Sequence, residues 1–378
     1  MTTRPSKLSV LHVVDSLEFG GLERVVTDLA IEQQARNHAV AVFSINDTTG
    51  FSEELRAAGI DVIVGHKKKP FDLQVLKILR REAKQRGVQI VHAHNFTPNY
   101  YSATALLGAW NMPALVGTCH DMGARLANRK LRIMYRWSVT RTQGLAMVGQ
   151  QVHDRYVESG MVPARKVTTV LNGIPVERFT STPQRQAQAR AKLGLNPDDL
   201  VIGCVGRLVD LKNHALLLQV MPALVQRHPR LKLVIVGYGE LEEALHAQTK
   251  ALGIAQQVTI TGKRSDVADL LPAFDVFALP SKTEGLSIAL LEACATGLAV
   301  VASAVGGNPE IVHDGQTGLL VPSQDAPALQ HALDRLLGDA PLRASLSAQA
   351  RDWVRQNASV AALADAYDHF YQQALQRR

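Results

Sequence analysis

The sequence predicts an α/β protein built from two doubly wound domains in tandem. Short apolar runs alternate with longer amphipathic segments, the alternation lapses once between residues 175 and 183, and the same rhythm then restarts. Short apolar strands joined by helical crossovers are typical of parallel sheets covered on both faces. The length agrees, because 378 residues at about 150 per domain give two domains.

The first half supplies the strands and helices of the first domain. Strands are expected at Leu8–Val14, Ala39–Ser44, Val62–Val64, Ile90–Ala93, Ala114–Thr118, Leu145–Val148 and Val167–Leu171. Helices are expected at Leu22–Ala35, Asp72–Arg86 and Thr97–Trp110. The strand segments are short apolar runs, whereas the helical segments are longer and amphipathic.

The second half repeats the pattern. Strands are expected at Val201–Val205, Leu231–Val236, Val258–Thr261, Val276–Ala278, Ala299–Ser303 and Gly318–Val321. Helices are expected at His214–His228, Glu240–Leu252 and Leu286–Thr296, and the tail from Ala326 reads as mostly helical. The nearly apolar segment from Ile288 to Gly307 is interrupted by Glu292 and by Gly297, so we interpret it as a buried helix and strand rather than a membrane span.

The linker is placed after Pro175, where the pattern lapses, and through the polar segment Gln184–Lys192. This predicts domains of residues 1–178 and 179–360, followed by a final helix at about 361–378. In two such domains the ligand site is expected at the carboxyl ends of the strands, in the cleft between the domains.

Cysteine usage and the N-terminus indicate a cytoplasmic protein. Cys119, Cys204 and Cys294 are far apart and odd in number, which favours a reducing compartment over a disulfide framework. The first apolar stretch is broken by His12 and closed by Asp15, so it does not resemble a secretory signal.

The excess of positive over negative charge belongs entirely to the first half of the chain. Residues 1–171 hold 22 Lys and Arg against 14 Asp and Glu, and the remainder holds 41 − 22 = 19 against 34 − 14 = 20. This asymmetry favours an anionic partner for the first domain: nucleic acid, an acidic membrane or a phosphorylated substrate.

Two cations follow the first strand of the second domain. Arg207 comes directly after Gly206, and Lys212 follows five residues later. Two cations five residues apart at the carboxyl end of a strand could bind one diphosphate, Arg as a planar fork and Lys as a point charge. A solvated surface pair is the alternative interpretation.

Two glutamates mark a second candidate site. Glu284 and Glu292 are eight residues apart, and Gly285 is expected to begin a helix whose free amides could hold a phosphate. Eight helical residues span roughly 12 Å, about the reach from a sugar across a diphosphate to a ribose. A carboxylate in an apolar helix needs a partner, so Glu292 is expected to bind either a ribose diol or a buried Arg.

The first domain offers a glycine pair and several histidines. Gly20 and Gly21 lie between a strand and a helix, where the backbone can approach an anion closely; a plain turn is the alternative. His120 ends the fifth strand and should face the cleft, unless it is only a hydrogen-bonded histidine at a strand end. His92 and His94 share a strand face, but no third ligand has suitable spacing, so no metal site is predicted. His94 is a candidate for lining the cleft.

Several motifs are missing. The chain contains no Asp-x-Asp, no Gly-x-Ser-x-Gly and no Walker loop, and the segment at Gly20 is not a dinucleotide fingerprint. Phosphate recognition is therefore expected to depend on Arg, Lys and helix N-termini, without a metal or other cofactor.

Taken together, these segments resemble the retaining glycosyltransferases of the GT-B fold, in the large bacterial family four (glycosyl transferases group 1). The resemblance covers nearly the whole chain. It rests on Gly20-Gly21-Leu22-Glu23, Val91-His92-Ala93-His94-Asn95, Asn172-Gly173-Ile174, Gly206-Arg207 with Lys212, Val236-Gly237-Tyr238-Gly239, Glu284 through Glu292, residues 306–310 and residues 318–322.

The resemblance implies roles for these residues in binding a nucleotide-sugar. Arg207 and Lys212 would neutralise the leaving diphosphate, and Glu284 would contact sugar hydroxyls. Glu292 would bind the ribose, and His120 would hydrogen-bond the sugar near the reacting centre. The remaining donor-binding positions are Gly20, Gly21, Gly206 and the amides of Gly285, Leu286 and Ser287.

The resemblance also implies a mechanism and a topology. Attack on the same face as the leaving group would retain the anomeric configuration, and the leaving phosphate would accept the acceptor's proton. Catalysis would then depend on positioning and on stabilising charge that develops on the diphosphate. The last helix is expected to cross back onto the first domain.

The acceptor is expected on the first domain, again by resemblance. Arg129, Ile133, Arg136 and Trp137 recur at helical spacing and mix cations with apolar anchors. They suggest a peripheral site on the inner face of the membrane and a glycan or lipid-linked, phosphate-bearing acceptor, as in polysaccharide or exopolysaccharide assembly. A solvated basic helix is the alternative.

Three functions remain open from the sequence. The first is transfer of a hexose-type sugar from a nucleotide-sugar, with UDP favoured over GDP. The second is a GT-B enzyme that uses a small soluble acceptor or epimerises a sugar nucleotide. The third is a non-catalytic membrane or nucleic-acid adaptor, which would leave Arg207, Lys212, Glu284 and Glu292 unexplained; the favoured function involves no nucleic acid.

Overall fold

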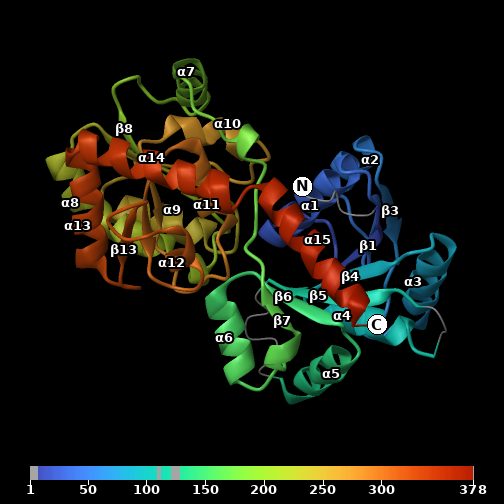
Figure 1. Cartoon of the computed structure of the whole chain (residues 1–378). Coiled ribbons are helices and arrows are strands. Elements are labelled where there is room, and N and C mark those ends of the chain that lie inside the picture. The colour runs from blue at the N-terminus through green and yellow to red at the C-terminus, as the bar shows by residue number, and fades with distance from the viewer. Residues whose placement is uncertain (1–6, 109–111, 121–127, 378) are drawn as a thin grey trace. The chain divides into compact units, whose positions relative to one another are not determined.

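The computed structural model describes residues 7–108, 112–120 and 128–377. The chain divides into two compact units: residues 1–173 together with 360–378 form unit 1, and residues 174–359 form unit 2. Each unit contains one parallel sheet with helices on both faces (Figure 1). The predicted fold class is thus confirmed.

Unit 1 contains a seven-stranded parallel sheet in the order β3-β2-β1-β4-β5-β6-β7. Its strands are β1 (Ser9–Val14), β2 (Ala39–Ser44), β3 (Asp61–Val64), β4 (Ile90–His94), β5 (Ala114–Cys119), β6 (Gly144–Met147) and β7 (Val167–Thr169). Its helices are α1 (Gly21–Ala35), α2 (Ser52–Ala57), α3 (Leu73–Gln85), α4 (Phe96–Ala105), α5 (Arg129–Thr140), α6 (Gln150–Glu158), the short η2 (Ala164–Lys166) and α15 (Val360–Gln376). The helix predicted to run to Trp110 ends at Ala105, and residues 109–111 lie outside the described part of the chain.

Unit 2 contains a six-stranded parallel sheet in the order β10-β9-β8-β11-β12-β13. Its strands are β8 (Leu200–Val205), β9 (Leu231–Val236), β10 (Val258–Ile260), β11 (Val276–Leu279), β12 (Ala299–Ser303) and β13 (Leu319–Val321). Its helices are η3 (Val176–Arg178), α7 (Pro183–Lys192), η4 (Asp210–Lys212), α8 (His214–Arg227), α9 (Glu242–Ala251), α10 (Val267–Leu270), η5 (Leu271–Ala273), α11 (Ile288–Thr296), α12 (Asn308–Ile311), α13 (Ala326–Gly338) and α14 (Ala340–Asn357).

The strand order reverses once in each sheet, and this fixes where a ligand can bind. Strands β1 and β4 are neighbours in unit 1, and β8 and β11 are neighbours in unit 2. The helices that follow the two strands of such a pair leave in opposite directions, which opens a crevice at the carboxyl ends of the strands. A ligand site is therefore expected beside the residues that follow β8 and β11, and beside those on β1 and β4.

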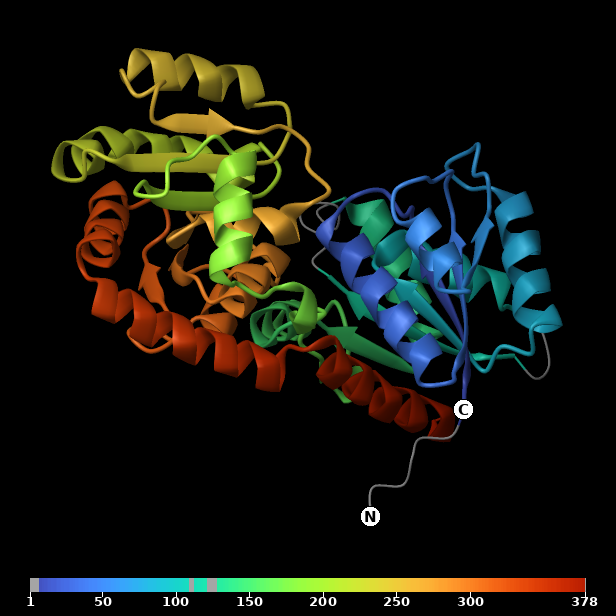
Figure 2. The same ribbon diagram turned by 90° about the horizontal axis from the view of Figure 1, so that it is seen from above.

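The C-terminal helix α15 is part of unit 1. It contacts α1 and β5, and the turned view shows it running beside α1 (Figure 2). The contact is close, because a Cβ atom on Gly144 of β6 would lie 2.8 Å from the Phe370 ring. The absence of a side chain at Gly144 thus lets α15 lie against the sheet.

The segment predicted to be a linker is instead helical. Residues 183–192 form α7, with Pro183 in its first turn and Thr182 as N-cap, whose hydroxyl accepts a hydrogen bond from the Arg185 amide at 3.2 Å. Arg190 anchors the helix, because its buried guanidinium pairs with Asp275 at 3.0 Å and donates to three backbone carbonyls. This polar segment is therefore a helix that the buried Arg190 holds in place, rather than a linker.

The division between the units also differs from the predicted boundary. It falls after Gly173 rather than after residue 178. The reason is that Ile174 already pairs with Ser359, and η3 packs against α11 in unit 2.

The apolar segment from Ile288 to Gly307 forms α11 and β12, as predicted, and both are buried. Among the helices that the structure describes, none is long and apolar enough to cross a membrane.

Candidate functional site

An ion pair joins the two loops that follow β8 and β11. Lys212 lies at the end of η4, and its Nζ donates to Glu284 Oε1 at 2.6 Å. The same oxygen accepts a hydrogen bond from Ser281 Oγ at 2.6 Å. The carboxylate is 8% exposed and the lysine side chain 20%, so the pair is shielded from water without being fully enclosed. The structure thus brings together two of the predicted site residues, at the reversal point of the sheet.

The backbones of these loops are bound to each other as well. The Lys282 amide donates to the Leu211 carbonyl at 2.8 Å, and the Lys282 side chain pairs with Asp210 at 2.5 Å. The Lys212 side chain extends over Gly206, where a Cβ atom would lie 3.5 Å from Lys212 Cδ. The position of the ammonium group is thus set by backbone as well as by its ion pair.

Glycines in neighbouring loops allow the close approach. A Cβ atom on Gly237 would collide with the Gly206 carbonyl, and one on Gly306 would collide with the Glu284 carbonyl. Gly306 also has φ of +55°, which L residues rarely adopt, and the Gly307 amide donates to the Gly285 carbonyl at 2.6 Å. Gly237, Gly306 and Gly307 belong to segments that carry the family resemblance, but the sequence alone gave these three no role in the site.

Arg207 is exposed beside this cluster. Its guanidinium has no ion pair with any residue that the structure describes. An exposed guanidinium next to a held ammonium offers a fork and a point charge to one anionic ligand.

The helix predicted to begin at Gly285 begins later. α11 starts at Ile288, and Ser287 is its N-cap, accepting a hydrogen bond from the Leu290 amide at 3.4 Å. Residues 284–287, including Leu286, form an irregular loop, so the span of roughly 12 Å, which assumed helical rise from Glu284 onward, is wrong. Glu292 lies in the second turn of α11 and is half-buried.

The cysteine near this cluster is not a nucleophile. Burial raises the pKa of the Cys204 thiol to about 12, and burial raises that of Cys294 to about 12 as well. Both remain protonated at neutral pH, and thiols react as thiolates.

In unit 1, His120 lies just after β5 and is half-buried. Its backbone amide donates to Asn95 Oδ1 at 2.8 Å, and Asn95 has the unusual φ of +69° at the end of β4. Burial lowers the pKa of His120 to about 3, so its imidazole is neutral. Asn95, which the sequence analysis did not select, thus fixes the backbone of His120.

The sequence predicted that His94 would line a cleft, but in the structure it does not line an open surface. It is fully buried, its Nε2 is 3.1 Å from His12 Nδ1, and its Nδ1 is 3.1 Å from His120 Nε2. A position at a strand end suggested access to solvent, but the rings of His12, His92 and His120 pack around His94.

The structure also supplies the third histidine that sequence spacing lacked. His12 on β1 is paired in register with His92 on β4, and one ring nitrogen from each of His12, His92 and His94 lies within 4.8 Å of the others. Local spacing could not reveal this, because β1 and β4 are neighbours only in the folded sheet.

The glycine pair lies where the sequence predicted, at the start of α1. Gly20 is the N-cap, with an extended backbone that any residue can adopt. A Cβ atom there would meet the flexible end of the Glu23 side chain. The backbone conformation therefore does not demand glycine at position 20.

The basic segment forms helix α5. Arg129, Ile133 and Arg136 are exposed on it, and Ile133 is 60% exposed. Trp137 instead turns inward, and its ring lies 5.7 Å from that of Tyr100.

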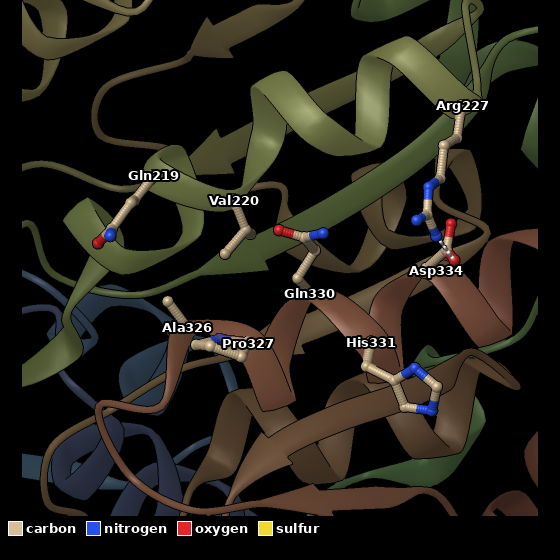
Figure 3. A pocket seen from close by; sticks show the side chains of 8 residues that line it. All are labelled: Gln219, Val220, Arg227, Ala326, Pro327, Gln330, His331 and Asp334. Atoms are coloured by element: carbon tan, nitrogen blue, oxygen red, sulfur yellow. Dashed lines mark hydrogen bonds and ion pairs between the residues drawn. The ribbon is translucent and has the colours of Figure 1, made fainter.

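A separate pocket lies between α8 and α13 (Figure 3). Its volume is about 410 Å³, and Arg227 and Asp334, which form an ion pair at 2.5 Å, lie at one end. None of the predicted site residues lines this pocket, so the candidate site is defined by the loops after β8 and β11 instead.

Comparison with known proteins gives the family. The model of glycosyltransferase family 4 matches residues 19–178, and that of glycosyl transferases group 1 matches residues 185–353. A GDP-mannose-dependent α-(1-6)-phosphatidylinositol monomannoside mannosyltransferase of Mycolicibacterium smegmatis is 35% identical over 224 residues, which are 56% of this chain and 58% of that protein. The match thus spans little more than half the length of that relative.

Two further comparisons extend over nearly the whole chain. The Escherichia coli UDP-Gal:α-D-GlcNAc-diphosphoundecaprenol α-1,3-galactosyltransferase is 26% identical over 90% of this chain and 91% of its own. HepE of Anabaena, crystallised with UDP and glucose, superposes with a TM-score of 0.86 at 21% identity, over 97% of this chain and 99% of its own. With two Rossmann-like domains and matches to both family models, this chain belongs to the family four (group 1) glycosyltransferases of the GT-B fold.

Proposed function

We propose that this chain is a retaining glycosyltransferase that transfers a hexose from a nucleotide-sugar to a lipid-linked or glycan acceptor in cell-surface polysaccharide assembly. The observation that carries the proposal is the Lys212–Glu284 pair, which joins the carboxyl ends of β8 and β11 with Arg207 exposed beside it. Cations held at that edge stabilise a departing diphosphate, and a carboxylate accepts hydrogen bonds from sugar hydroxyls.

In this proposal the donor is bound without a metal ion. Arg207 and Lys212 neutralise the diphosphate, amides near Ser287 at the start of α11 contact the distal phosphate, and Glu292 accepts hydrogen bonds from the ribose. The sequence contains no Asp-x-Asp, the carboxylate clamp commonly used to hold a divalent cation on a diphosphate.

A UDP-sugar is the proposed donor, and a phosphate-bearing lipid the proposed acceptor. The E. coli relative, whose match covers about nine-tenths of both chains, is named for UDP-Gal and for a diphosphoundecaprenol acceptor. The mycobacterial relative is named for GDP-mannose and a phosphatidylinositol acceptor, but the match spans only 58% of its length. The fuller match supports UDP.

A thermal-shift panel of UDP, GDP, ADP and their common sugar conjugates tests the donor site. A ligand at a hundredfold excess over its Kd stabilises the folded state by about 2.7 kcal/mol, so a UDP-sugar should raise the Tm clearly. Arg207→Ala and Glu292→Ala should abolish the shift. Arg230→Ala is the matched control, because this arginine is 71% exposed but precedes β9, at the opposite edge of the sheet.

The panel also separates the competing functions. If none of the nucleotides or nucleotide-sugars raised the Tm, the proposal would be overturned and the adaptor favoured. Binding of a UDP-sugar with release of an epimer, but no transfer to an added acceptor, would favour the epimerase. Glu284→Ala should abolish transfer, whereas an adaptor would be indifferent to this change.

We further propose that unit 1 binds an anionic membrane surface through α5. Arg129, Arg136 and the exposed Ile133 lie on this helix. The exposed Phe71 lies nearby, because its ring is 6.1 Å from that of Tyr100, which in turn is 5.7 Å from the Trp137 ring of α5. Cations around exposed apolar side chains are typical of helices that lie on a lipid surface.

Flotation with liposomes tests this surface. Vesicles containing phosphatidylglycerol should carry the protein upward at low salt, and phosphatidylcholine vesicles should not. The triple change Arg129→Ala, Ile133→Ser, Arg136→Ala should abolish flotation. Removing two exposed cations from unit 2, Arg230→Ala with Lys250→Ala, is the control for lost charge. No flotation of the unmodified protein at low salt would exclude the surface.

A further inference from the structure

Four histidines form a buried cluster in unit 1. His12 lies on β1, His92 and His94 lie on β4, and His120 follows β5. Their positions span the reversal point of the sheet, between β1 and β4, where a ligand is expected. Three of them are at most 2% exposed, and His120 alone reaches the partly exposed edge.

Three of these histidines form a linear hydrogen-bonded chain with Gln33 of α1. Gln33 Oε1 is 2.8 Å from His12 Nε2, and His12 Nδ1 is 3.1 Å from His94 Nε2. His94 Nδ1 is in turn 3.1 Å from His120 Nε2. His12 and His94 therefore each use one ring nitrogen toward the residue before and the other toward the residue after, and His120, at the end, contributes Nε2.

The imidazoles in this chain are neutral. Burial lowers the pKa of His12 to about 4 and that of His120 to about 3, and burial together with the neighbouring histidines lowers that of His94 well below its usual value. A neutral imidazole carries one proton, so one of its nitrogens donates and the other accepts.

One end of the chain therefore determines every proton in it. The carbonyl oxygen of Gln33 can only accept, so the proton of His12 lies on Nε2 and its Nδ1 accepts. His94 must then donate from Nε2 to His12. His94 Nδ1 accepts in turn, so His120 donates from Nε2, and its Nδ1 carries no proton.

Gln33 is itself held by a second branch of contacts. Its amide nitrogen donates to the Tyr371 hydroxyl at 3.3 Å, and that hydroxyl is 2.7 Å from His92 Nδ1. His92 Nε2 is 2.6 Å from Thr118 Oγ1, which is 2.8 Å from the Tyr367 hydroxyl. A half-turn of the Gln33 amide would reverse the whole chain, because its nitrogen would then donate to His12.

We propose that Gln33 is a positioning residue which, through His12 and His94, holds His120 as its Nε2–H tautomer and leaves Nδ1 as a hydrogen-bond acceptor. The acceptor serves a substrate hydroxyl, and this last clause rests on the proposed function. Two residues, His12 and His94, lie between Gln33 and His120, and Gln33 acts on His120 only through their rings.

A metal ion shared by His12, His92 and His94 is the competing arrangement of the same side chains. It is disfavoured because each ring nitrogen of the three already lies within 3.1 Å of another hydrogen-bonding group. Binding a metal would therefore require each of the three rings to give up at least one of these contacts.

Long-range ¹H–¹⁵N correlation spectra of the full-length protein, labelled with ¹⁵N-histidine, test the proposal at neutral pH without any substrate. His12→Gln, His94→Gln and His120→Gln assign the signals. His12, His94 and His120 should each show one protonated Nε2 and one unprotonated Nδ1. An Nδ1–H or doubly protonated His120 would overturn the proposal, and so would stoichiometric metal in the purified protein.

Three substitutions in α1 test the role of Gln33. Gln33→Met removes the acceptor, so the two nitrogen resonances of His120 should move toward each other as both tautomers become populated. Gln33→Glu keeps a carbonyl oxygen at the same place and should restore the Nε2–H pattern. Gln34→Met is the matched control on the neighbouring residue. If Gln33→Met left the His120 spectrum unchanged, Gln33 would not be the positioning residue.

The spectra separate this inference from the proposed function. If the protein showed the Nε2–H tautomer of His120 but bound no nucleotide-sugar, the role of Gln33 would stand and the proposed function would be refuted. The converse result, binding with His120 in the other tautomer, would refute only the role of Gln33.

Discussion

Glu284 depends on Lys212 because its carboxylate is almost completely removed from water. Lys212 Nζ and Ser281 Oγ both donate hydrogen bonds to Glu284 Oε1. The pair is both a candidate donor site and a structural tie between two loops, so these two roles need separate measurements.

A double-mutant cycle measures the structural part. We expect Lys212→Met and Glu284→Gln to couple by about 1–2 kcal/mol in the free energy of unfolding of unit 2. Each single change leaves the other side chain shielded from water and without its ion-pair partner. Fluorescence of Trp353 in urea, with Trp110 and Trp137 replaced by Phe, reports on unit 2.

The neighbouring pair Lys282–Asp210 provides the control. Its side chains are 30% and 73% exposed, so the same cycle there should give no more than about 0.5 kcal/mol. Equal coupling at the two sites would mean that the shielding of Glu284 from water contributes nothing.

Residue identities could be predicted wherever function required a particular residue type in a local pattern. Lys212 and Glu284 were selected from sequence and do meet in the structure. His12 and Gln33 were missed, because their roles depend on the pairing of β1 with β4 and on the packing of α1, neither of which leaves a local pattern.

Helix α15 shows how an element from the far end of the chain completes a domain. Its buried face places Tyr371 and Tyr367 against the histidine cluster and Phe370 against Gly144. Asp368 of this helix also places Oδ1 3.1 Å from Nε2 of His38, in the segment after α1. Unit 1 is therefore incomplete without the C-terminal helix.

Gly144→Ala tests this contact. The added methyl group would lie 2.8 Å from the Phe370 ring, so α15 must shift from the sheet, and we expect a loss of about 1–3 kcal/mol in the stability of unit 1. Gly338→Ala is the matched control, because no heavy atom lies within 4 Å of its added Cβ. Thermal unfolding should show a lower Tm for Gly144→Ala only; a normal Tm would mean that Phe370 moves freely.

Element boundaries were harder to predict than elements. Periodicity located the strands well, because parallel strands buried on both faces are short apolar runs. It failed at α7, where a polar segment is held as a helix by Arg190, and at α11, which begins at Ile288 rather than Gly285. In both cases the cause is a tertiary contact or a cap, which a pattern of apolar residues does not show.

At the scale of the whole molecule, the two units differ in their buried histidines. Each unit has a hydrophobic core of its own, so the two need not unfold together. Among the described residues, burial lowers the pKa of His12, His92, His94 and His120 in unit 1, whereas His214 is the one such histidine in unit 2.

Mild acid should therefore unfold unit 1 first. The unfolded chain binds protons on these histidines below pH 6.5, whereas the folded chain does not until about pH 4, so stability is lost as the pH falls through this window. For each buried histidine, the free energy of unfolding falls by about 1.4 kcal/mol per pH unit of acidification in this window.

Hydrogen exchange at pH 7 and 5.5, corrected for intrinsic rates, should show opening of unit 1 peptides while unit 2 remains protected. His120→Gln should reduce the pH dependence of unit 1 by about one proton. Opening of unit 2 first would show that the histidine cluster does not govern acid stability.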